Sequence, residues 1–273
     1  MTLLKNLFKF YLNASIHVAF AVYAFLRITD FYFDIQYNEN LNYFVFFATI
    51  TGYNFVKYAG VAKLHHRSLT ESLKAIQVFS FFCFLAMCYY AYQIPLKTLL
   101  FSAPFALLTL LYAIPLLSGF EKNLREISHL KIVVVALVWT GFTVLLPIFD
   151  AEKPLNFEVV IYSIQRFLII VVLILPFDIR DVKYDSISLQ TIPQKIGIEK
   201  TKRLGVILLV IALVLEYLVS ATSNVKTPFL LFFFISLILL MRSKIEQSKY
   251  YSSFWVEALP IFWWLLLLGF DNL

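Results

Sequence analysis

Charged side chains are scarce in this 273-residue chain. Asp, Glu, Lys and Arg together make up 15% of the residues, whereas a soluble domain averages about 25%. The chain has two cysteines, Cys83 and Cys88, which lie in one apolar run; this argues against a disulfide framework or a cysteine metal site. There is also no glycine-rich nucleotide loop, no zinc-ligand spacing and no nucleophile-elbow motif. These absences argue against soluble nucleotide-dependent, zinc-dependent and serine-nucleophile enzymes.

Apolar residues are abundant instead. Hydrophobic residues make up 61% of the chain, including 29 Phe, and the mean hydropathy is +0.80. A membrane-spanning helix needs about 17–25 mainly apolar residues, and open strands leave backbone groups that lipid cannot satisfy. We therefore predict an all-α, polytopic membrane protein with a single domain, residues 1–273, and about nine transmembrane helices. The predicted spans are residues 11–29, 41–58, 73–93, 98–118, 131–149, 157–177, 204–221, 227–241 and 252–270.

The basic residues mark one end of these spans. The formal net charge is +6, but Lys and Arg gather in the loops that follow every second span. The only basic residues in the loops on the opposite side are Lys97, Lys153 and Lys226. Because basic loops tend to stay in the cytoplasm, we predict a cytoplasmic N-terminus and an outer C-terminus, in a bacterial inner membrane. This distribution indicates contact with membrane lipid and argues against a nucleic-acid partner.

Three carboxylates follow the sixth predicted span. Asp178, Asp181 and Asp185 lie at offsets i, i+3 and i+7, which on a helix fall within roughly 60° of one another. Three like charges at a membrane boundary are costly unless a cation neutralises them. Mg²⁺ prefers carboxylate oxygens and keeps waters or phosphate oxygens as its other ligands. We therefore predict a Mg²⁺ site in which these aspartates are both the metal ligands and the catalytic residues.

Basic side chains follow the aspartates at Lys183, Lys195, Lys202 and Arg203. Metal-binding carboxylates beside cations suit a diphosphate leaving group, because negative charge builds up on the departing oxygen. The alternative is that these are ordinary loop charges solvated at the level of the lipid headgroups. The shared helical face of the aspartates favours the diphosphate interpretation.

The same stretch resembles a known motif. The second aspartate-rich motif of the UbiA family of intramembrane prenyltransferases reads roughly D-x-R-D-x-x-x-D, followed by a T-x-P-x-x-x-G turn. The residues that fit are Asp178, Arg180, Asp181, Asp185, Thr191, Pro193, Lys195 and Gly197. The resemblance implies an all-helical fold around a central cavity, in which Mg²⁺ bridges two aspartate-rich motifs and an isoprenyl diphosphate. It also implies transfer of the isoprenyl group, through an allylic cation, to an aromatic or lipid acceptor.

The family's first motif, roughly N-D-x-x-D-x-x-x-D after the second span, is incomplete here. Within residues 51–69, Asn54 takes the place of the motif's Asn, and Arg67 resembles a basic step that follows it. No carboxylate occurs between Glu39 and Glu71. The three acidic positions are occupied by Phe55, Tyr58 and Ala62. One metal can still bind the aspartates of the second motif, but a second metal has only the Asn54 carbonyl oxygen.

Two interpretations of this departure stay open. In the first, Lys57, Lys63 or Arg67 holds the diphosphate directly, and the chain is a working prenyltransferase. In the second, the segment with the incomplete first motif has lost its catalytic role. The chain is then a non-catalytic UbiA-like membrane protein that binds a lipid or a partner protein.

A third group of residues begins near the end of the fourth span and continues after it. Tyr112, Lys122 and Arg125 resemble the family's Y-x-x-P segment with its downstream basic residues, which could complete a diphosphate cradle. Basic residues at a cytoplasmic boundary explain the two cations equally well. The full set of predicted substrate-binding residues is Asn54, Arg67, Tyr112, Lys122, Arg125, Arg180, Lys183 and Lys195.

Two further charges, Arg166 and Glu216, lie inside predicted spans. Intramembrane charges usually face the interior of the bundle or each other, so we expect these two to pair. Such charges also occur in transporters, which makes transport a third hypothesis, ranked below the other two.

Overall fold

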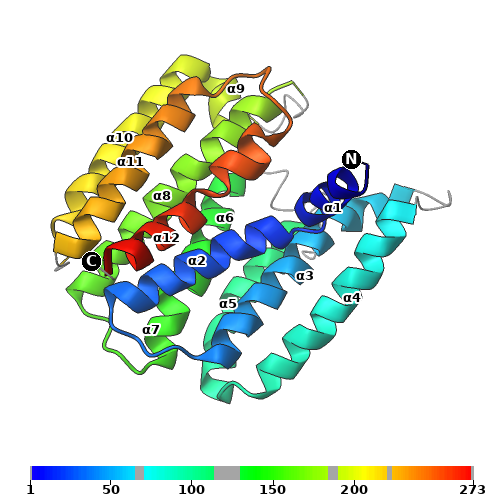
Figure 1. Cartoon of the computed structure of the whole chain (residues 1–273), viewed down its shortest axis with the longest axis horizontal. Helices are drawn as coiled ribbons and strands as arrows, with labels where there is room; N and C mark the ends of the chain where they lie inside the picture. Colours follow the sequence, from blue (N-terminus) through cyan, green and yellow to red (C-terminus); the bar gives the residue numbers. More distant parts are fainter. Residues whose placement is uncertain (1, 65–70, 114–129, 184–189, 220–222, 272–273) are drawn as a thin grey trace.

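The computed structural model describes residues 2–64, 71–113, 130–183, 190–219 and 223–271, which form helices and no strand (Figure 1). The first half contains α1 (Thr2–Asn13), α2 (Ile16–Tyr32), α3 (Glu39–Leu64), α4 (Glu71–Tyr92) and α5 (Leu96–Ala113). The second half contains α6 (Leu130–Thr140), the π-helical turn η2 (Gly141–Leu145), α7 (Leu146–Asp150), α8 (Phe157–Asp181), α9 (Ile192–Ile196), α10 (Ile198–Glu216), α11 (Ser223–Arg242), the π-helical turn η4 (Tyr251–Val256) and α12 (Leu259–Asp271). The predicted all-α class is confirmed.

Every predicted span overlaps a helix, but not every helix is apolar enough to count as a span on its own. Six helical segments of the described residues are long and apolar enough to cross a membrane, and a seventh results if the bent pair α1–α2 is one span. The helix α10 falls short because it begins with charged residues, Glu199, Lys200, Lys202 and Arg203. The chain is therefore a multi-pass membrane protein, as predicted, while the count of nine stays a prediction.

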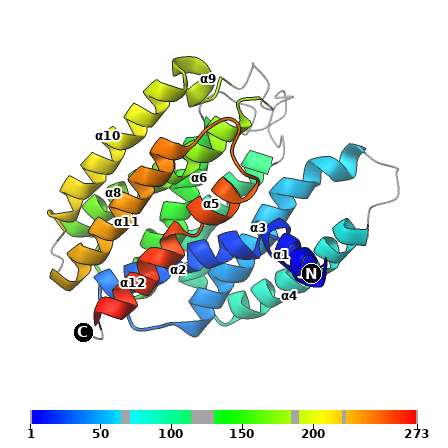
Figure 2. The same cartoon turned by 45° about the horizontal axis from the view of Figure 1, so that its top comes forward.

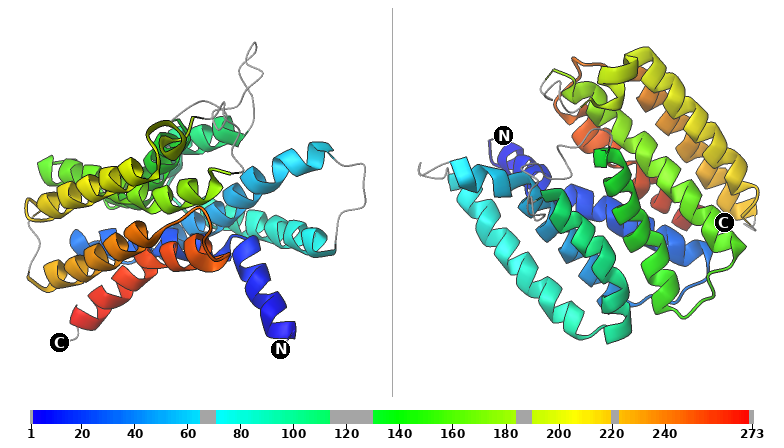
Figure 3. Two further views of the ribbon diagram at one scale, coloured as in Figure 1. Left: turned by 90° about the horizontal axis from the view of Figure 1, so that it is seen from above. Right: turned by 180° about the vertical axis from the view of Figure 1, so that it is seen from behind.

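The helices close a ring. In order around it, α2 packs on α3, then α5, α6, α8, α10, α11 and α12 follow, and α12 packs on α2 again (Figures 1 and 2). The helix α4 packs on α3. The helix α1 leaves the body of the protein at 56° to α2 (Figure 3). The ring agrees with the predicted helical bundle, while the central cavity that the resemblance implies stays a prediction.

The largest part of the core lies among α8, α10, α11 and α12. Trp263 is fully buried and stacks on Phe232 at a ring-centroid distance of 4.7 Å. Gly205 of α10 lies so close to α11 that a Cβ atom there would be 2.5 Å from Leu240, as is typical of small residues between membrane helices. On the outer face of α4, in contrast, side chains such as Phe82 are 61% exposed. The exposed apolar face suits contact with lipid.

Arg166 and Glu216 lie in one buried network without an ion pair between them. Arg166 of α8 donates a hydrogen bond of 2.7 Å to the backbone oxygen of Phe25 in α2. Glu216 of α10 accepts hydrogen bonds from the Tyr32 hydroxyl at 2.8 Å and the Gln165 amide at 2.7 Å. The expected direct pair is therefore wrong. These bonds instead anchor α8 to α2 and α10, and they add no support to the transport hypothesis.

Candidate active site

The second aspartate motif begins in the last turn of α8. Asp178 and Asp181 lie where the backbone carbonyl groups of the helix carry a partial negative charge. Gln247 donates a hydrogen bond of 3.0 Å to the carbonyl oxygen of Pro176, which joins this end of α8 to the segment before η4. The carboxylates and the helix end are negative together, so this position favours nearby cations.

Asp178 is the buried member of the pair. Its side chain is 1% exposed, and its Oδ1 atom lies 2.9 Å from the Lys131 ammonium group at the start of α6. Removing a carboxylate from water is costly, and an ion pair with good geometry offsets part of that cost. Sequence reasoning did not include Lys131 in the site. The available signal was a lysine at the start of an apolar run, at the same predicted end of the bundle as the aspartates.

Asp181 is more accessible and has its own cation. Arg180 donates two hydrogen bonds to it, 2.7 Å from Nε to Oδ1 and 3.1 Å from Nη2 to Oδ2. The two side chains are 30% and 25% exposed. The Arg180 guanidinium group also lies 5.3 Å from the centre of the Phe177 ring. The predicted substrate-binding residue Arg180 thus neutralises a predicted metal ligand.

The T-x-P-x-x-x-G stretch forms the short helix α9 and the start of α10. Thr191 is the N-cap of α9, and its backbone N–H donates to the Gln194 side chain at 3.0 Å. Pro193 lies in the first turn, where a missing N–H is tolerated. Gly197 ends α9 with a φ of 84°, which favours glycine. Because α9 packs on α8, the exposed Lys195 is held near the end of the motif helix.

Asn54 of the incomplete first motif is buried and hydrogen-bonded within the protein. Its Oδ1 atom accepts a bond of 2.7 Å from the Ser15 hydroxyl. Its amide nitrogen donates to the backbone oxygen of Ala14 at 3.0 Å and to the Ser80 hydroxyl at 2.8 Å. Asn54 thereby joins α3 to α4 and to the start of α2. A role in ligand binding would have to use the second lone pair of its carbonyl oxygen or break one of these bonds.

Glu257 interacts with basic side chains of both motif helices, α3 and α8. It directly follows η4, is partly buried, and interacts electrostatically with Lys57 of α3 and Arg180 of α8. Lys57 also donates a hydrogen bond of 2.9 Å to the Ser15 hydroxyl. Sequence reasoning placed Glu257 in the last predicted span and did not assign it to the site. Glu257 is therefore close enough to Lys57 of α3 and to Arg180 of α8 to interact with the charges of both.

Tyr112 of α5 is buried near Tyr53 of α3. It is 9% exposed and interacts electrostatically with Tyr53 of α3, whose hydroxyl accepts a hydrogen bond of 2.9 Å from Trp139. Tyr53 also interacts electrostatically with Glu257. The predicted residue Tyr112 is therefore linked to Glu257 through Tyr53.

Lys183 lies at the surface beyond α8. Its ammonium group is 2.7 Å from a carboxylate oxygen of Glu246, and both side chains are mostly exposed. The hydrogen bond and the charge of Lys183 lower the pKa of the Glu246 carboxyl group below its ordinary value. The remaining predicted site residues, Arg67, Lys122, Arg125 and Asp185, lie outside the described residues.

Solved structures resemble this fold, although the sequence matches no protein-family model and no curated protein. A UbiA homologue from Archaeoglobus fulgidus bound to GPP and Mg²⁺ matches with a TM-score of 0.62 at 14% identity, over 97% of this chain and 100% of that chain. An apo UbiA homologue from Aeropyrum pernix K1 gives 0.63 at 15% identity, over 94% and 98%. A digeranylgeranylglyceryl phosphate synthase gives 0.56 at 16% identity, over 98% of each chain.

This chain has the UbiA fold. The predicted resemblance is thus confirmed at the level of the fold, over nearly the whole length of the solved relatives.

Within the UbiA fold, the donor set of this chain suits one metal ion. Asp178 and Asp181 offer hard carboxylate oxygens from one helix, which is the donor type that Mg²⁺ prefers. Among the described residues, no three acidic, histidine or cysteine side chains gather around one point. Each aspartate is now paired with a cation, so a metal ion would take the place of Lys131 or Arg180 and leave that cation able to contact phosphate.

Proposed function

We propose that the chain is a UbiA-type prenyltransferase, which moves an isoprenyl group from an isoprenyl diphosphate to an aromatic or lipid acceptor in a Mg²⁺-dependent reaction. The observation that carries this proposal is that Lys131 and Arg180 pair with the two carboxylates at the end of α8, while Glu257 interacts with both Arg180 and Lys57 of α3. A diphosphate group carries two to three negative charges and needs several such partners. The GPP- and Mg²⁺-bound Archaeoglobus relative supports the choice of ligand.

The residues of the chain bind and orient the diphosphate in this reaction. Lys131 and Arg180 turn from their carboxylates to phosphate oxygens, and Lys57 approaches from the α3 wall. As the bond between the prenyl carbon and the diphosphate oxygen breaks, its electron pair goes to the oxygen, and these cations stabilise the growing charge. Asp178 and Asp181 would hold Mg²⁺, which neutralises charge on the leaving group when bound.

The proposal includes an orientation in the membrane. The cations of the site, Lys57, Lys131 and Arg180, lie toward the ends of α3, α6 and α8 that adjoin the basic loops, which we expect to face the cytoplasm. The diphosphate would then enter from the inner leaflet, with its apolar chain among the membrane helices. Cysteine labelling from either side of inverted vesicles, at Lys195→Cys and Lys153→Cys, tests this orientation.

Transfer assays test the reaction. Purified protein is incubated with Mg²⁺, labelled isoprenyl diphosphates and a panel of quinone-precursor and lipid acceptors. We expect transfer that Asp181→Asn reduces by roughly two orders of magnitude, as is typical when a group that stabilises the departing charge is lost. Glu199→Gln is a matched control, since Glu199 is an exposed acid at the start of α10. Absent transfer, with diphosphate binding that Asp181→Asn does not change, would contradict the proposal.

A second candidate is a non-catalytic protein that binds a lipid or a partner protein. Two observations favour it: Asn54 is fully engaged as a donor within the protein, and α3 presents Lys57 in the region where the family has carboxylates. This candidate predicts binding of an isoprenyl diphosphate or another anionic lipid that does not require Mg²⁺ and leads to no transfer. Measurable transfer by the natural sequence would exclude it.

A further inference from the structure

The helix α1 differs in direction from the membrane-spanning helices. It meets α2 at an angle of 56° and extends sideways from the body of the protein (Figure 3). The 17 residues of α2 cover roughly 25 Å, which is most of a hydrocarbon core of about 30 Å. Because of the bend, the 12 residues of α1 add only roughly 10 Å along the direction of α2. The helix α1 therefore lies near one surface of the membrane and runs obliquely to it.

The bend between α1 and α2 is held on both sides. Ser15, which precedes α2, has a φ of 62°, and a right-handed helix cannot continue through this conformation. Its hydroxyl donates a hydrogen bond of 2.7 Å to Oδ1 of Asn54 and accepts one of 2.9 Å from the Lys57 ammonium group. Within α1, the Phe10 ring packs edge-on against Phe79 of α4 at a ring-centroid distance of 5.5 Å. These contacts fix the direction of α1 and place it at the same end of the bundle as Lys57.

Apolar and polar side chains occupy opposite sides of α1. Over residues 3–13, a turn of 100° per residue puts the apolar side chains in one arc and the polar side chains in the other. The apolar arc contains Leu3, Leu4, Leu7, Phe8, Phe10, Tyr11 and Leu12, and the polar arc contains Lys5, Asn6, Lys9 and Asn13. In the apolar arc, Leu3, Leu4 and Leu7 are 71%, 74% and 55% exposed. Contiguous exposed leucines are unfavourable in water, so this side of α1 calls for an apolar partner.

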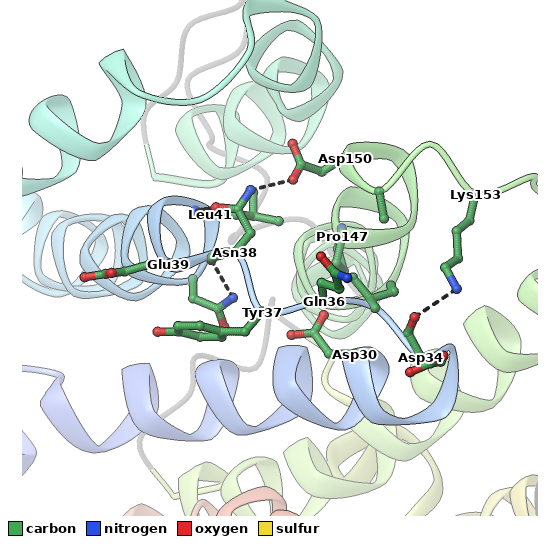
Figure 4. A pocket seen from close by; sticks show the side chains of 13 residues that line it. Asp30, Asp34, Gln36, Tyr37, Asn38, Glu39, Leu41, Pro147, Asp150 and Lys153 are labelled. Carbon is green, nitrogen blue, oxygen red and sulfur yellow. Dashed lines mark hydrogen bonds between the residues drawn. The ribbon is translucent and has the colours of Figure 1, made fainter.

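The polar side of α1 carries charge of one sign. Lys5 and Lys9 lie at i and i+4, one turn apart on the same side. Neither lysine forms an ion pair or a side-chain hydrogen bond within the part of the chain that the structure describes, and no acid precedes Asp30 in the sequence. Acids gather instead at the far end of α2, where a pocket is lined by Asp30, Asp34, Glu39 and Asp150 (Figure 4). The α1 end of α2 is therefore the end that suits an anionic partner.

We propose that α1 lies in the surface of the membrane leaflet at this end of the bundle and binds the headgroups of anionic lipids. The exposed leucines enter the acyl chains, while Lys5 and Lys9 contact lipid phosphates. Amphipathic helices with lysines on the polar side bind anionic membrane surfaces in this way. A second copy of the chain or a partner protein could cover the leucines, but neither accounts for two uncompensated lysines beside them. This inference does not depend on the proposed transfer reaction.

Spin labels on the full-length chain in lipid nanodiscs test the placement of α1. Labels are attached at Leu4→Cys, Leu7→Cys or Asn6→Cys in a background with Cys83→Ala and Cys88→Ala. We expect oxygen, which dissolves in acyl chains, to reach the labels at positions 4 and 7, and a water-soluble nickel complex to reach the label at position 6. Three results overturn the proposal: oxygen alone reaches all three labels, the nickel complex reaches all three equally, or positions 4 and 7 are protected from both reagents, as a protein partner would protect them.

Lipid retention tests the role of the two lysines. Native mass spectrometry compares the lipids kept by protein released from nanodiscs that contain equal amounts of phosphatidylglycerol and phosphatidylcholine. We expect Lys5→Gln with Lys9→Gln to lower the ratio of retained phosphatidylglycerol to phosphatidylcholine at least about fivefold, the effect of one lysine near an anionic surface. The matched control is Lys200→Gln with Lys244→Gln, which removes two exposed lysines outside α1. A ratio that falls no further in the α1 variant than in the control overturns the proposal.

Discussion

The Lys131 ammonium group lies 2.9 Å from the Asp178 carboxylate and joins the start of α6 to the end of α8. The carboxylate is 1% exposed and the lysine 23%. The contact has two consequences: it stabilises a buried negative charge in the absence of ligand, and it holds a cation next to the aspartate motif.

The first prediction concerns the stability of this pair. Lys131→Met should lower the free energy of unfolding by roughly 3 kcal/mol, because it removes the cation of a buried ion pair. The double variant Lys131→Met with Asp178→Asn should recover much of that loss, since both charges are then removed. Denaturant unfolding in detergent gives the free energies for a double-mutant cycle. Equal losses in the single and double variants would contradict the assigned pair.

The second prediction concerns Lys57. If the α3 wall contacts diphosphate, Lys57→Met should weaken the binding of an isoprenyl diphosphate roughly tenfold, as expected for the loss of one charge-assisted hydrogen bond. Lys249→Met is the control, because Lys249 lies in the segment before η4 and its ammonium group lies 5.9 Å from the centre of the neighbouring Tyr250 ring. Equilibrium binding with a labelled diphosphate measures both. Equal affinities for the two variants would remove α3 from the site.

The third prediction concerns Gly197. Its φ of 84° is unfavourable for other residues, although a Cβ atom there would meet no other atom within 4 Å. Gly197→Ala should therefore destabilise the protein by about 1 kcal/mol through the backbone alone. Gly269→Ala is the matched control: it also has open space around the Cβ position, but it lies inside α12 without a positive φ. We expect it to be neutral or slightly stabilising in thermal unfolding.

The fourth prediction concerns pH. The Lys183 ammonium group lowers the pKa of the Glu246 carboxyl group in the folded protein. The pair therefore contributes to stability when the pH is above the pKa that Glu246 has in the unfolded chain. This contribution is lost as the pH falls through the lower pKa of Glu246 in the folded protein. NMR titration should show the Glu246 carboxyl group titrating below its ordinary value, and Lys183→Gln should raise it toward that value. Because both side chains are mostly exposed, we expect little change in overall stability. An unchanged pKa in Lys183→Gln would show that the pair does not persist in solution.

Local features of the site could be predicted from the sequence. The predicted span over residues 157–177 placed Asp178 and Asp181 at its end, and α8 ends at Asp181. The T-x-P-x-x-x-G pattern corresponds to a cap at Thr191, a proline in the first turn and a positive φ at Gly197. Such features depend on backbone preferences of neighbouring residues, which a single sequence records directly.

Contacts between helices could not be predicted in the same way. Lys131 and Asp178 are separated by 47 residues, and their pairing depends on how α6 packs against α8. Glu257 lay in a predicted apolar span, so nothing local indicated that it would lie near Lys57 and Arg180. The same reason explains the failed pair of Arg166 with Glu216: intramembrane charges are expected to face inward, but the sequence does not show which neighbouring side chains lie between the two.

The most direct test of the central claim is equilibrium binding of labelled geranyl diphosphate to the purified natural protein, with Mg²⁺ and with a chelator. The claim is that Lys131 and Arg180, beside the carboxylates at the end of α8, bind an isoprenyl diphosphate. Asp178 and Asp181 then hold one Mg²⁺. We predict saturable binding that Mg²⁺ strengthens and that Asp178→Asn makes independent of Mg²⁺. Binding that does not respond to Mg²⁺ in the natural protein would favour the non-catalytic candidate, and no saturable binding under either condition would contradict the claim.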